Sequence, residues 1–202
     1  MADLDTYSVL TEKGEGLFKD KGSKFYAFAL PISSEDELKP LLEEIKSIHP
    51  KARHYCFAYR MGEKGEIYRA NDDGEPGGSA GKPILNVLLS NQLTNTLVVV
   101  VRYFGGTLLG VPGLIHAYKE AAKLAIETAT IEEKTSNDTF EIAFGFEQMN
   151  EVMRILKENN VKIIEQIFHE KWGLIFEIRQ SQSSLLIQKL TDIYGVSLCS
   201  NE

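Results

Sequence analysis

The amino-acid sequence predicts an α+β protein of two domains. Three observations support this: segments of strand and helix periodicity follow one another along 202 residues, a polar segment interrupts them near residue 135, and a compact β-α-β-β-α-β pattern follows it. A chain of this length is enough for two small domains that each bury a core. We therefore expect a first domain over residues 1–135 and a second over residues 136–202.

The first domain begins with aromatic strands. Residues 17–30 contain two such strands about a polar turn. Ser34 and Glu37 have the spacing of a capping box, and the leucines and isoleucines that follow predict a helix. Alternation then predicts a strand over residues 54–60, which returns through a glycine loop into residues 67–70.

Glycine loops and regular elements alternate in the rest of this domain. Ser79 is the expected N-cap of a helix that runs through Leu89. The β-branched run within residues 96–103 is typical of a strand covered on both faces. A long helix is expected from about Leu114 to Thr128.

The second domain has the order of a split βαβ, ferredoxin-like arrangement. Residues 132–138 are polar and lack an apolar anchor, so we place the linker there. The strands are expected at residues 139–144, 161–168, 173–178 and 196–199, and the helices at residues 147–159 and 183–194.

The net charge of −7 argues against a protein that coats nucleic acid by bulk electrostatics. Residues 1–135 hold 16 Lys and Arg against 19 Asp and Glu, whereas residues 136–202 hold 6 against 10. A local basic patch on the first domain is compatible with these numbers, but the second domain is a poor candidate for binding a phosphate backbone.

The sequence also predicts a cytosolic protein with no membrane contact. Its longest uninterrupted apolar run, residues 97–101, is too short to cross a bilayer. The first residues carry acid where a signal peptide carries Lys or Arg. The two cysteines, Cys56 and Cys199, have no metal-ligand spacing, which indicates free thiols in a reducing compartment.

One glycine-rich loop carries three carboxylates, Asp72, Asp73 and Glu75. These side chains could hold Mg²⁺ through oxygen ligands. Alternatively, the backbone of residues 77–79 and the following helix N-terminus could cradle a phosphate. The third interpretation is structural, with turn formers followed by a helix cap.

A second glycine loop follows Arg102, Tyr103 and Phe104. A cation and two aromatic rings at the end of a buried strand suit stacking on a base or gripping a phosphate. The alternative is that the rings are core residues.

His54 and Cys56 project on one face if their segment is a strand, which places a thiol within reach of a base. A cysteine in the middle of a strand is more often buried and inert.

Basic residues surround the first hairpin and recur near the two glycine loops. They could together form one positive face on an acidic protein, or they could be ordinary solvated surface. These residues are Lys13, Lys19, Lys21, Lys24, Arg53, Arg60, Arg69, Lys82 and Arg102.

Three segments carry motifs in a fixed order: Ala52–Tyr59, Asn71–Ile84, and Val101–Gly106 with its continuation to Tyr118. Their order and spacing resemble the IMPACT family, in its bacterial YigZ-like branch. The resemblance covers essentially the whole chain, and the three motifs together are far more specific than any one of them.

The resemblance implies a first domain with the β-α-β fold of a small-subunit ribosomal protein, which also occurs in elongation factor G. It implies a ferredoxin-like second domain similar to a late domain of that factor. Eukaryotic relatives are translational regulators in the amino-acid starvation response, and RNA or ribosome binding is the usual inference for bacterial members. No catalytic residue and no cofactor carries over.

We expect a translation-associated binding protein whose partner is RNA, the ribosome or a translation-linked protein. The alternatives are a metal-dependent hydrolase or phosphotransferase that uses the Asp72–Glu75 loop, and a protein–protein adaptor without nucleic-acid contact. The candidate ligand surface comprises His54, Asp72, Asp73, Glu75, Lys82, Arg102, Tyr103, Phe104 and His116.

The chain departs from the family at two of its motif positions. Pro112-Gly113 stands where the family usually has Gly-Gly, and His116 stands where it usually has Arg. The second departure removes a permanent cation from the start of the long helix, although a protonated His116 could partly replace it.

Overall fold

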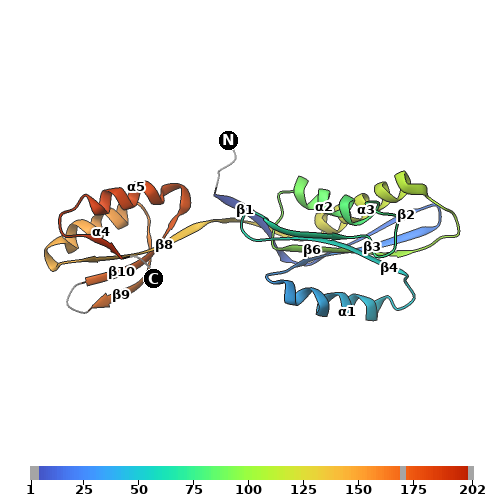
Figure 1. Cartoon of the computed structure of the whole chain (residues 1–202), viewed down its shortest axis with the longest axis horizontal. Helices are drawn as coiled ribbons and strands as arrows, with labels where there is room; N and C mark the ends of the chain where they lie inside the picture. The colour runs from blue at the N-terminus through green and yellow to red at the C-terminus, as the bar shows by residue number, and fades with distance from the viewer. Residues whose placement is uncertain (1–4, 169–171, 200–202) are drawn as a thin grey trace. The chain divides into compact units, whose positions relative to one another are not determined.

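The structure, a computed structural model, describes residues 5–168 and 172–199. They form two compact units of mixed α and β structure, as the sequence predicts (Figure 1). The first unit spans residues 7–134, and the second joins Asp5 and Thr6 to the residues from 135 onward. No helix among the described residues is both long and apolar enough to cross a membrane.

A five-stranded sheet with the strand order β2-β3-β6-β4-β5 forms the centre of the first unit. All neighbouring strands in it are antiparallel. Its strands are β2 (Gly14–Asp20), β3 (Ser23–Pro31), β4 (His54–Met61), β5 (Ile67–Asn71) and β6 (Thr96–Tyr103).

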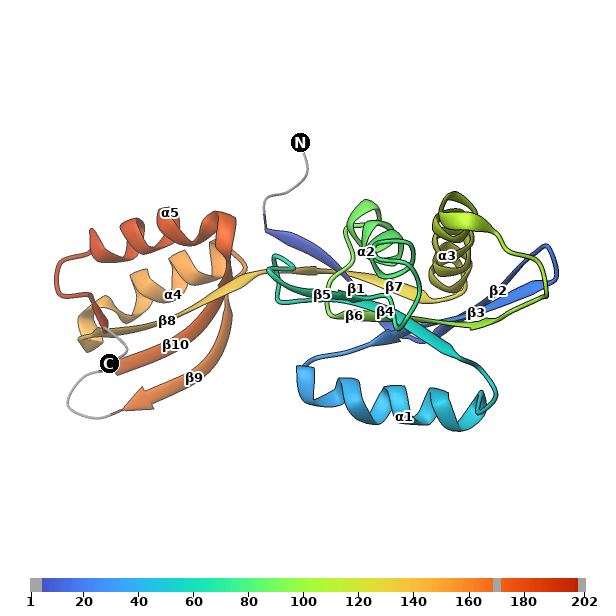
Figure 2. The ribbon, with the colours of Figure 1, turned by 45° about the vertical axis from the view of Figure 1, so that its right-hand side comes forward.

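Helices cover both faces of this sheet, so β6 is buried on both sides (Figure 2). Helix α1 (Leu38–Ile48) lies on one face, and α2 (Gly81–Ser90) and α3 (Gly110–Glu127) lie on the other. Val98 and Val100 pack in the core beneath α2 and α3, whereas Val99 and Val101 pack in the core beneath α1. The β-branched run therefore has the double coverage that the sequence predicts.

The polar segment predicted as a linker is instead strand. Strand β7 (Thr130–Thr135) pairs with β1 (Thr6–Glu12) in a two-stranded sheet, and only Ser136 separates β7 from the next strand. Thr130 donates a hydrogen bond from Oγ1 to Glu12 Oε2 at 2.9 Å, and it accepts one from Thr11 through its carbonyl. Every residue of β7 is exposed, so the hydrophobic pattern gives no signal for this strand, whereas β1 buries Val9 and Leu10 in the core.

Three predicted helix starts are also displaced. A 3₁₀ turn over Glu35–Glu37 moves the start of α1 to Leu38, and Ser34 makes no capping hydrogen bond with its side chain. Helix α2 begins at Gly81 without a cap from Ser79, whose Oγ donates to the carbonyl of Pro76. Helix α3 begins four residues before the predicted Leu114.

The second unit has the predicted element order, with strands in the sheet order β11-β8-β10-β9. Its helices α4 (Met149–Glu158) and α5 (Gln180–Thr191) pack on one face of the sheet. Its other elements are β8 (Asn137–Phe144), the 3₁₀ turn Phe146–Gln148, β9 (Lys162–Phe168), β10 (Trp172–Arg179) and β11 (Ser197–Cys199).

Asp5 explains why the first described residues belong to the second unit rather than to the predicted first domain. Its carboxylate accepts hydrogen bonds from Arg179 Nε at 2.9 Å and from the backbone N–H of Ser181 at 2.9 Å. The Arg179 and Ser181 donors lower the pKa of Asp5 from 3.8 to about 2. The ionised carboxylate also lies at the N-terminus of α5, where negative charge is favourable.

The second unit should therefore lose stability in acid through Asp5. A carboxyl whose pKa is lower in the folded state stabilises that state above the unfolded value of 3.8, and this contribution disappears as the pH falls to about 2. We expect Asp5→Asn to lower the melting temperature at pH 7, with the difference from the wild type shrinking between pH 4 and pH 2. Thermal melts monitored by circular dichroism would check this, and a difference that does not change with pH would contradict it.

Candidate functional site

The end of β6 carries a buried ion pair. Arg102 Nη1 lies 2.7 Å from Glu75 Oε1, and the two side chains are only 7% and 4% exposed. The guanidinium lies between two aromatic rings, with its carbon 5.6 Å from the centroid of Phe25 and 5.7 Å from that of Phe104. Removing two charges from water is costly, so the pair needs this close geometry to be stable.

A hydrogen-bonded cluster extends from the pair into the core. Tyr118 of α3 donates from its hydroxyl to Glu75 Oε1 at 2.8 Å. Cys56 Sγ lies 3.3 Å from that hydroxyl and 2.9 Å from the carbonyl oxygen of Asp72. Burial raises the pKa of the Cys56 thiol, which keeps it protonated and unreactive. The cluster therefore favours the inert interpretation of Cys56 over a nucleophile paired with His54.

Asp72 caps helix α2 from outside the helix. Its carboxylate accepts hydrogen bonds from the backbone N–H groups of Gly78, Ala80 and Gly81 at 2.8, 3.0 and 2.8 Å. Burial opposes its ionisation, but these three donors outweigh burial and lower the pKa of Asp72. The N–H groups proposed as a phosphate cradle are thus already bound by a carboxylate of this chain.

Asp73 also performs a structural task. Its Oδ2 accepts the backbone N–H of Tyr55 at 2.6 Å, and its own N–H donates to Asn71 Oδ1 at 2.8 Å. The residue has a φ of +40°, a left-handed conformation that aspartate tolerates better than most residues. The three loop carboxylates therefore bind three different sets of donors, and the described residues contain no His, Cys, Asp and Glu group suited to a metal.

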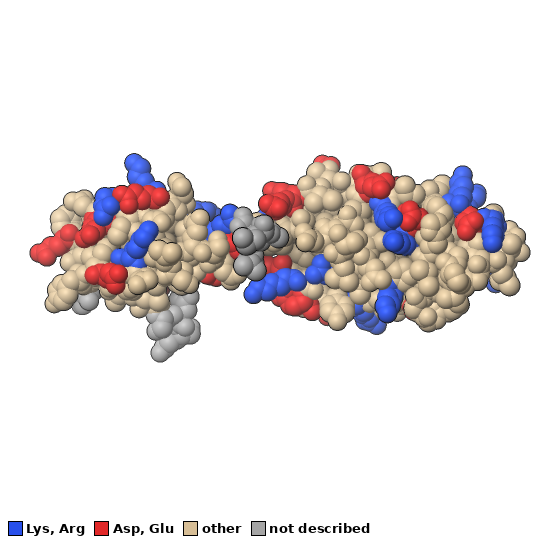
Figure 3. Space-filling model, turned by 90° about the horizontal axis from the view of Figure 1, so that it is seen from above, with Lys and Arg blue, Asp and Glu red and all other residues tan. Residues whose placement is uncertain are grey.

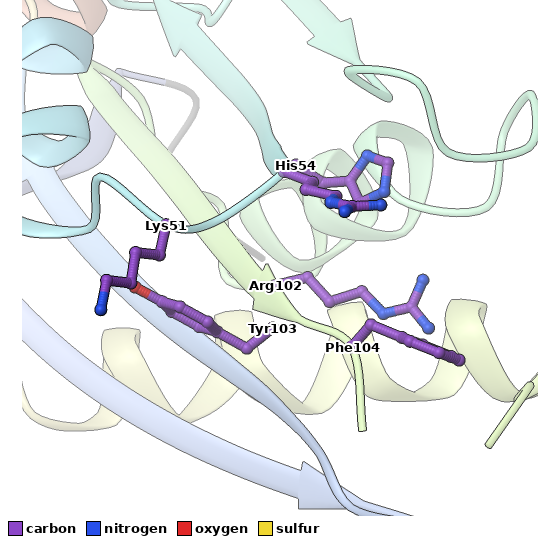
Figure 4. Close-up of a pocket in the computed structure, with 6 residues that line it drawn as sticks. Lys51, His54, Arg102, Tyr103 and Phe104 are labelled. Atoms are coloured by element: carbon purple, nitrogen blue, oxygen red, sulfur yellow. The ribbon is translucent and has the colours of Figure 1, made fainter. Parts of the chain in front are cut away.

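A cavity of about 390 Å³ lies between the start of β4 and the end of β6 (Figure 4). Lys51, Arg53, His54, Arg102, Tyr103 and Phe104 line it. Alternation along β6 turns Arg102 toward the α2 and α3 side and Tyr103 toward the α1 side, and the two side chains diverge in the close-up. Phe104 follows the last strand residue and remains 58% exposed.

The cavity is basic because two of its cations have no counter-charge. Lys51 and Arg53 are exposed and form no ion pair within the described part of the chain, whereas Arg102 is neutralised by Glu75. His54 Nδ1 lies 2.8 Å from the carbonyl oxygen of Asp73. A carbonyl only accepts, so Nδ1 carries the proton and Nε2 is left for another partner.

A second cavity of about 370 Å³ shares Tyr103 and Phe104 as a common wall. Its other lining residues are Gly22, Lys24, Tyr26 and His49. His49 Nδ1 lies 3.1 Å from the Tyr103 hydroxyl, and burial lowers the pKa of this imidazole. Lys24 lines the cavity on one side of the Tyr103–Phe104 wall, and Lys51 and Arg53 line the cavity on the other side. All three are exposed.

Close backbone packing holds this wall in place. A Cβ on Gly105 would lie 1.9 Å from the carbonyl carbon of Gly22, so the loop after β6 packs directly on the turn between β2 and β3. Ser23 Oγ accepts the N–H of Gly105 at 3.1 Å. The position requires glycine for this reason.

Two candidate residues lie neither in the cavity lining nor in the carboxylate loop. Lys82 is exposed in the first turn of α2, and the His116 ring packs edge-on against Phe18 with centroids 5.6 Å apart. Two of the nine residues considered for a positive face are engaged elsewhere, because Arg102 is buried against Glu75 and Arg60 donates to the carbonyl of Leu93. Basic and acidic side chains are interspersed on the face of the first unit seen in Figure 3.

Of the nine candidate residues, the structure brings His54, Arg102, Tyr103 and Phe104 together at the cavity. Asp72, Asp73 and Glu75 instead organise the loop beside it. Lys51 was not a candidate from the sequence. Its position three residues before His54, just ahead of a strand that begins with this candidate residue, is the signal that could have identified it.

Comparison with known proteins gives consistent matches. Residues 21–126 match the family model of the Impact N-terminal domain. YvyE of Bacillus subtilis (strain 168), named an IMPACT family member, is 30% identical over 190 residues, which cover 94% of this chain and 88% of YvyE. YigZ of Escherichia coli (strain K12), also named an IMPACT family member, is 33% identical over 146 residues, or 71% of this chain and 72% of YigZ.

A solved structure supports the same fold. The crystal structure of a hypothetical protein matches with a TM-score of 0.65 and 25% identity, over 99% of both chains.

Removing one partner of the buried ion pair should destabilise the first unit strongly. We expect Arg102→Met to cost about 3–5 kcal/mol, because Glu75 would be left charged in the core. The double variant Arg102→Met/Glu75→Gln should recover most of this loss, since a neutral amide can still accept from Tyr118. Urea unfolding of the three proteins would check this, and equal losses in the single and double variants would contradict it.

Replacing Asp72, whose carboxylate caps helix α2, should destabilise the start of that helix. We expect Asp72→Ala to lower the free energy of unfolding by about 1–2 kcal/mol, because buried N–H groups lose their acceptor. Lys82→Ala, an exposed change in the same helical turn, serves as the control and should change stability little. Hydrogen exchange of residues 78–84 should accelerate in the first variant alone.

Proposed function

The chain belongs to the IMPACT family, and we propose that it is a translation-associated protein that binds RNA at the cavity beside Phe104. One observation carries the proposal: two unpaired cations and an exposed aromatic ring line the same cavity. Within this proposal, residues 7–134 are the Impact N-terminal domain with a ribosomal-protein-like fold. The second unit is a ferredoxin-like domain similar to one of elongation factor G, and the protein acts in the cytoplasm.

The chemistry of the cavity suits unpaired nucleotides. Bases stack on exposed rings whatever their sequence, and lysine and arginine bind the phosphates between them. Phe104 is the exposed ring, and Lys51 and Arg53 are free to contact phosphate. On a protein of net charge −7 this attraction must be local, so we expect RNA to bind at the cavity and not over the whole surface.

The replacement of the family's arginine by His116 is compatible with this proposal. His116 packs against Phe18 and is not among the residues that line the cavity. The cavity therefore keeps Lys51 and Arg53 as its free cations, whichever residue stands at position 116.

The test measures binding of the full chain to a labelled single-stranded RNA and its co-sedimentation with ribosomes. Base stacking is worth about 1–3 kcal/mol, so we expect Phe104→Ala to weaken RNA binding about fivefold to a hundredfold. Lys51→Glu/Arg53→Glu should also weaken it, and should reduce the slope of log affinity against log salt by about 1.4 for two phosphate contacts. Arg102 is unsuitable for this test because its loss is expected to destabilise the unit strongly.

Lys157→Glu/Lys189→Glu provides the matched control, since it changes the net charge equally at two exposed lysines of the second unit. It should leave RNA binding nearly unchanged. Equal loss in both double variants would show only bulk electrostatics and would contradict an RNA site at the cavity. Ribosome association that survives nuclease and the Phe104→Ala change would instead indicate a protein partner.

A further inference from the structure

The sheet of the second unit has one face without a helix. Ile142, Phe144, Leu174, Phe176 and Ile178 alternate along β8 and β10 and pack in the core with α4 and α5. The residues between them point to the opposite side. This open face comprises Asn137, Thr139, Glu141 and Ala143 of β8, Gly173, Ile175, Glu177 and Arg179 of β10, Lys162, Glu165 and Ile167 of β9, and Ser197 and Cys199 of β11.

Two glutamates flank an apolar residue in the middle of the open face. Ile175 pairs directly with Glu141 on one side and with Glu165 on the other. Strands in a sheet lie about 4.8 Å apart, so the two glutamates stand about 10 Å apart across Ile175. Ile175 is half-buried and Glu165 is exposed, which leaves this row accessible from solvent.

The glutamates in the middle of the open face are not neutralised by basic residues of that face. Its described cations are both already paired: Lys162 Nζ lies 2.9 Å from Glu177 Oε2, and Arg179, the next residue on this side of β10, pairs with Asp5. Glu141 and Glu165 have no ion-pair partner within the described part of the chain. The open face therefore presents an apolar centre between two uncompensated negative charges.

These charges decide which partner fits. RNA-binding sheets of comparable size stack bases on aromatic residues of their central strands. The described open face has no aromatic residue, and its unpaired charges repel phosphate. Lysine or arginine side chains on a partner would neutralise Glu141 and Glu165, and an apolar side chain between them would cover Ile175.

We propose that the open face of the second unit binds an extended basic polypeptide segment, with an apolar side chain over Ile175 and a basic side chain at each of Glu141 and Glu165. This site differs in place and in charge from the RNA site proposed on the first unit. The chain then has two binding surfaces of opposite charge preference, and each can be tested without the other.

The experiment uses the full chain and a labelled peptide in which arginines flank a central isoleucine. An exposed ion pair contributes about 0.2–1 kcal/mol, so loss of two should weaken peptide binding about twofold to thirtyfold in Glu141→Gln/Glu165→Gln. Glu147→Gln/Glu151→Gln removes the same charge at two exposed positions, one in the 3₁₀ turn before α4 and one in its first turn, and should bind like the wild type. A peptide with glutamates in place of the arginines should not bind.

Amide chemical shifts of the unmodified chain provide a second measurement that does not depend on the variants. Addition of the basic peptide should shift resonances of β8, β9 and β10 around Ile175. Shifts confined to other elements, equal losses in the two double variants, or displacement of the peptide from this face by single-stranded RNA would each overturn the proposal.

Discussion

The ion pair between Arg102 and Glu75 connects the interior of the first unit to its functional surface. It joins the end of β6 to the carboxylate loop, and Tyr118 adds helix α3 to the same cluster. A charge pair this deeply buried depends on close geometry, because its attraction must offset the loss of hydration, and among the described residues Arg102 Nε finds no hydrogen-bond partner. Phe104 helps to cover the guanidinium while it also presents a ring to the cavity. The binding surface and the core are consequently parts of one structure.

The hydrophobic periodicity of short sequence segments was sufficient to predict most of the helices and strands. The β-branched run predicted a strand buried on both faces, and the order of elements in the second unit followed from helical and strand periodicity. The family was also identified from three short motifs, and the comparisons confirm it. These features depend on residues that are near one another in sequence, which is the range over which periodicity carries information.

The roles of the motif residues could not be predicted in the same way. Asp72 looked like a metal or turn residue, but it caps a helix that begins nine residues later. Arg102 looked like a surface cation, yet its partner is 27 residues away and is set by the fold of the loop. Lys51 became a candidate only when the register of β4 and β6 placed it in the lining of the same cavity as Phe104. Such assignments depend on long-range geometry that no window of sequence contains.

The contacts of Asp5 with Arg179 and Ser181 place the first unit between two segments of the second along the chain. The chain passes through Asp5, forms residues 7–134, and only then continues into the rest of the second unit. Asp5 can form its hydrogen bonds with Arg179 only after that residue, 174 positions further along the chain, has been synthesised. During synthesis the inserted unit can fold as soon as it leaves the ribosome, whereas its host can close only when translation is almost complete. Premature termination anywhere in the last strands would thus leave a folded insert attached to an unfinished host.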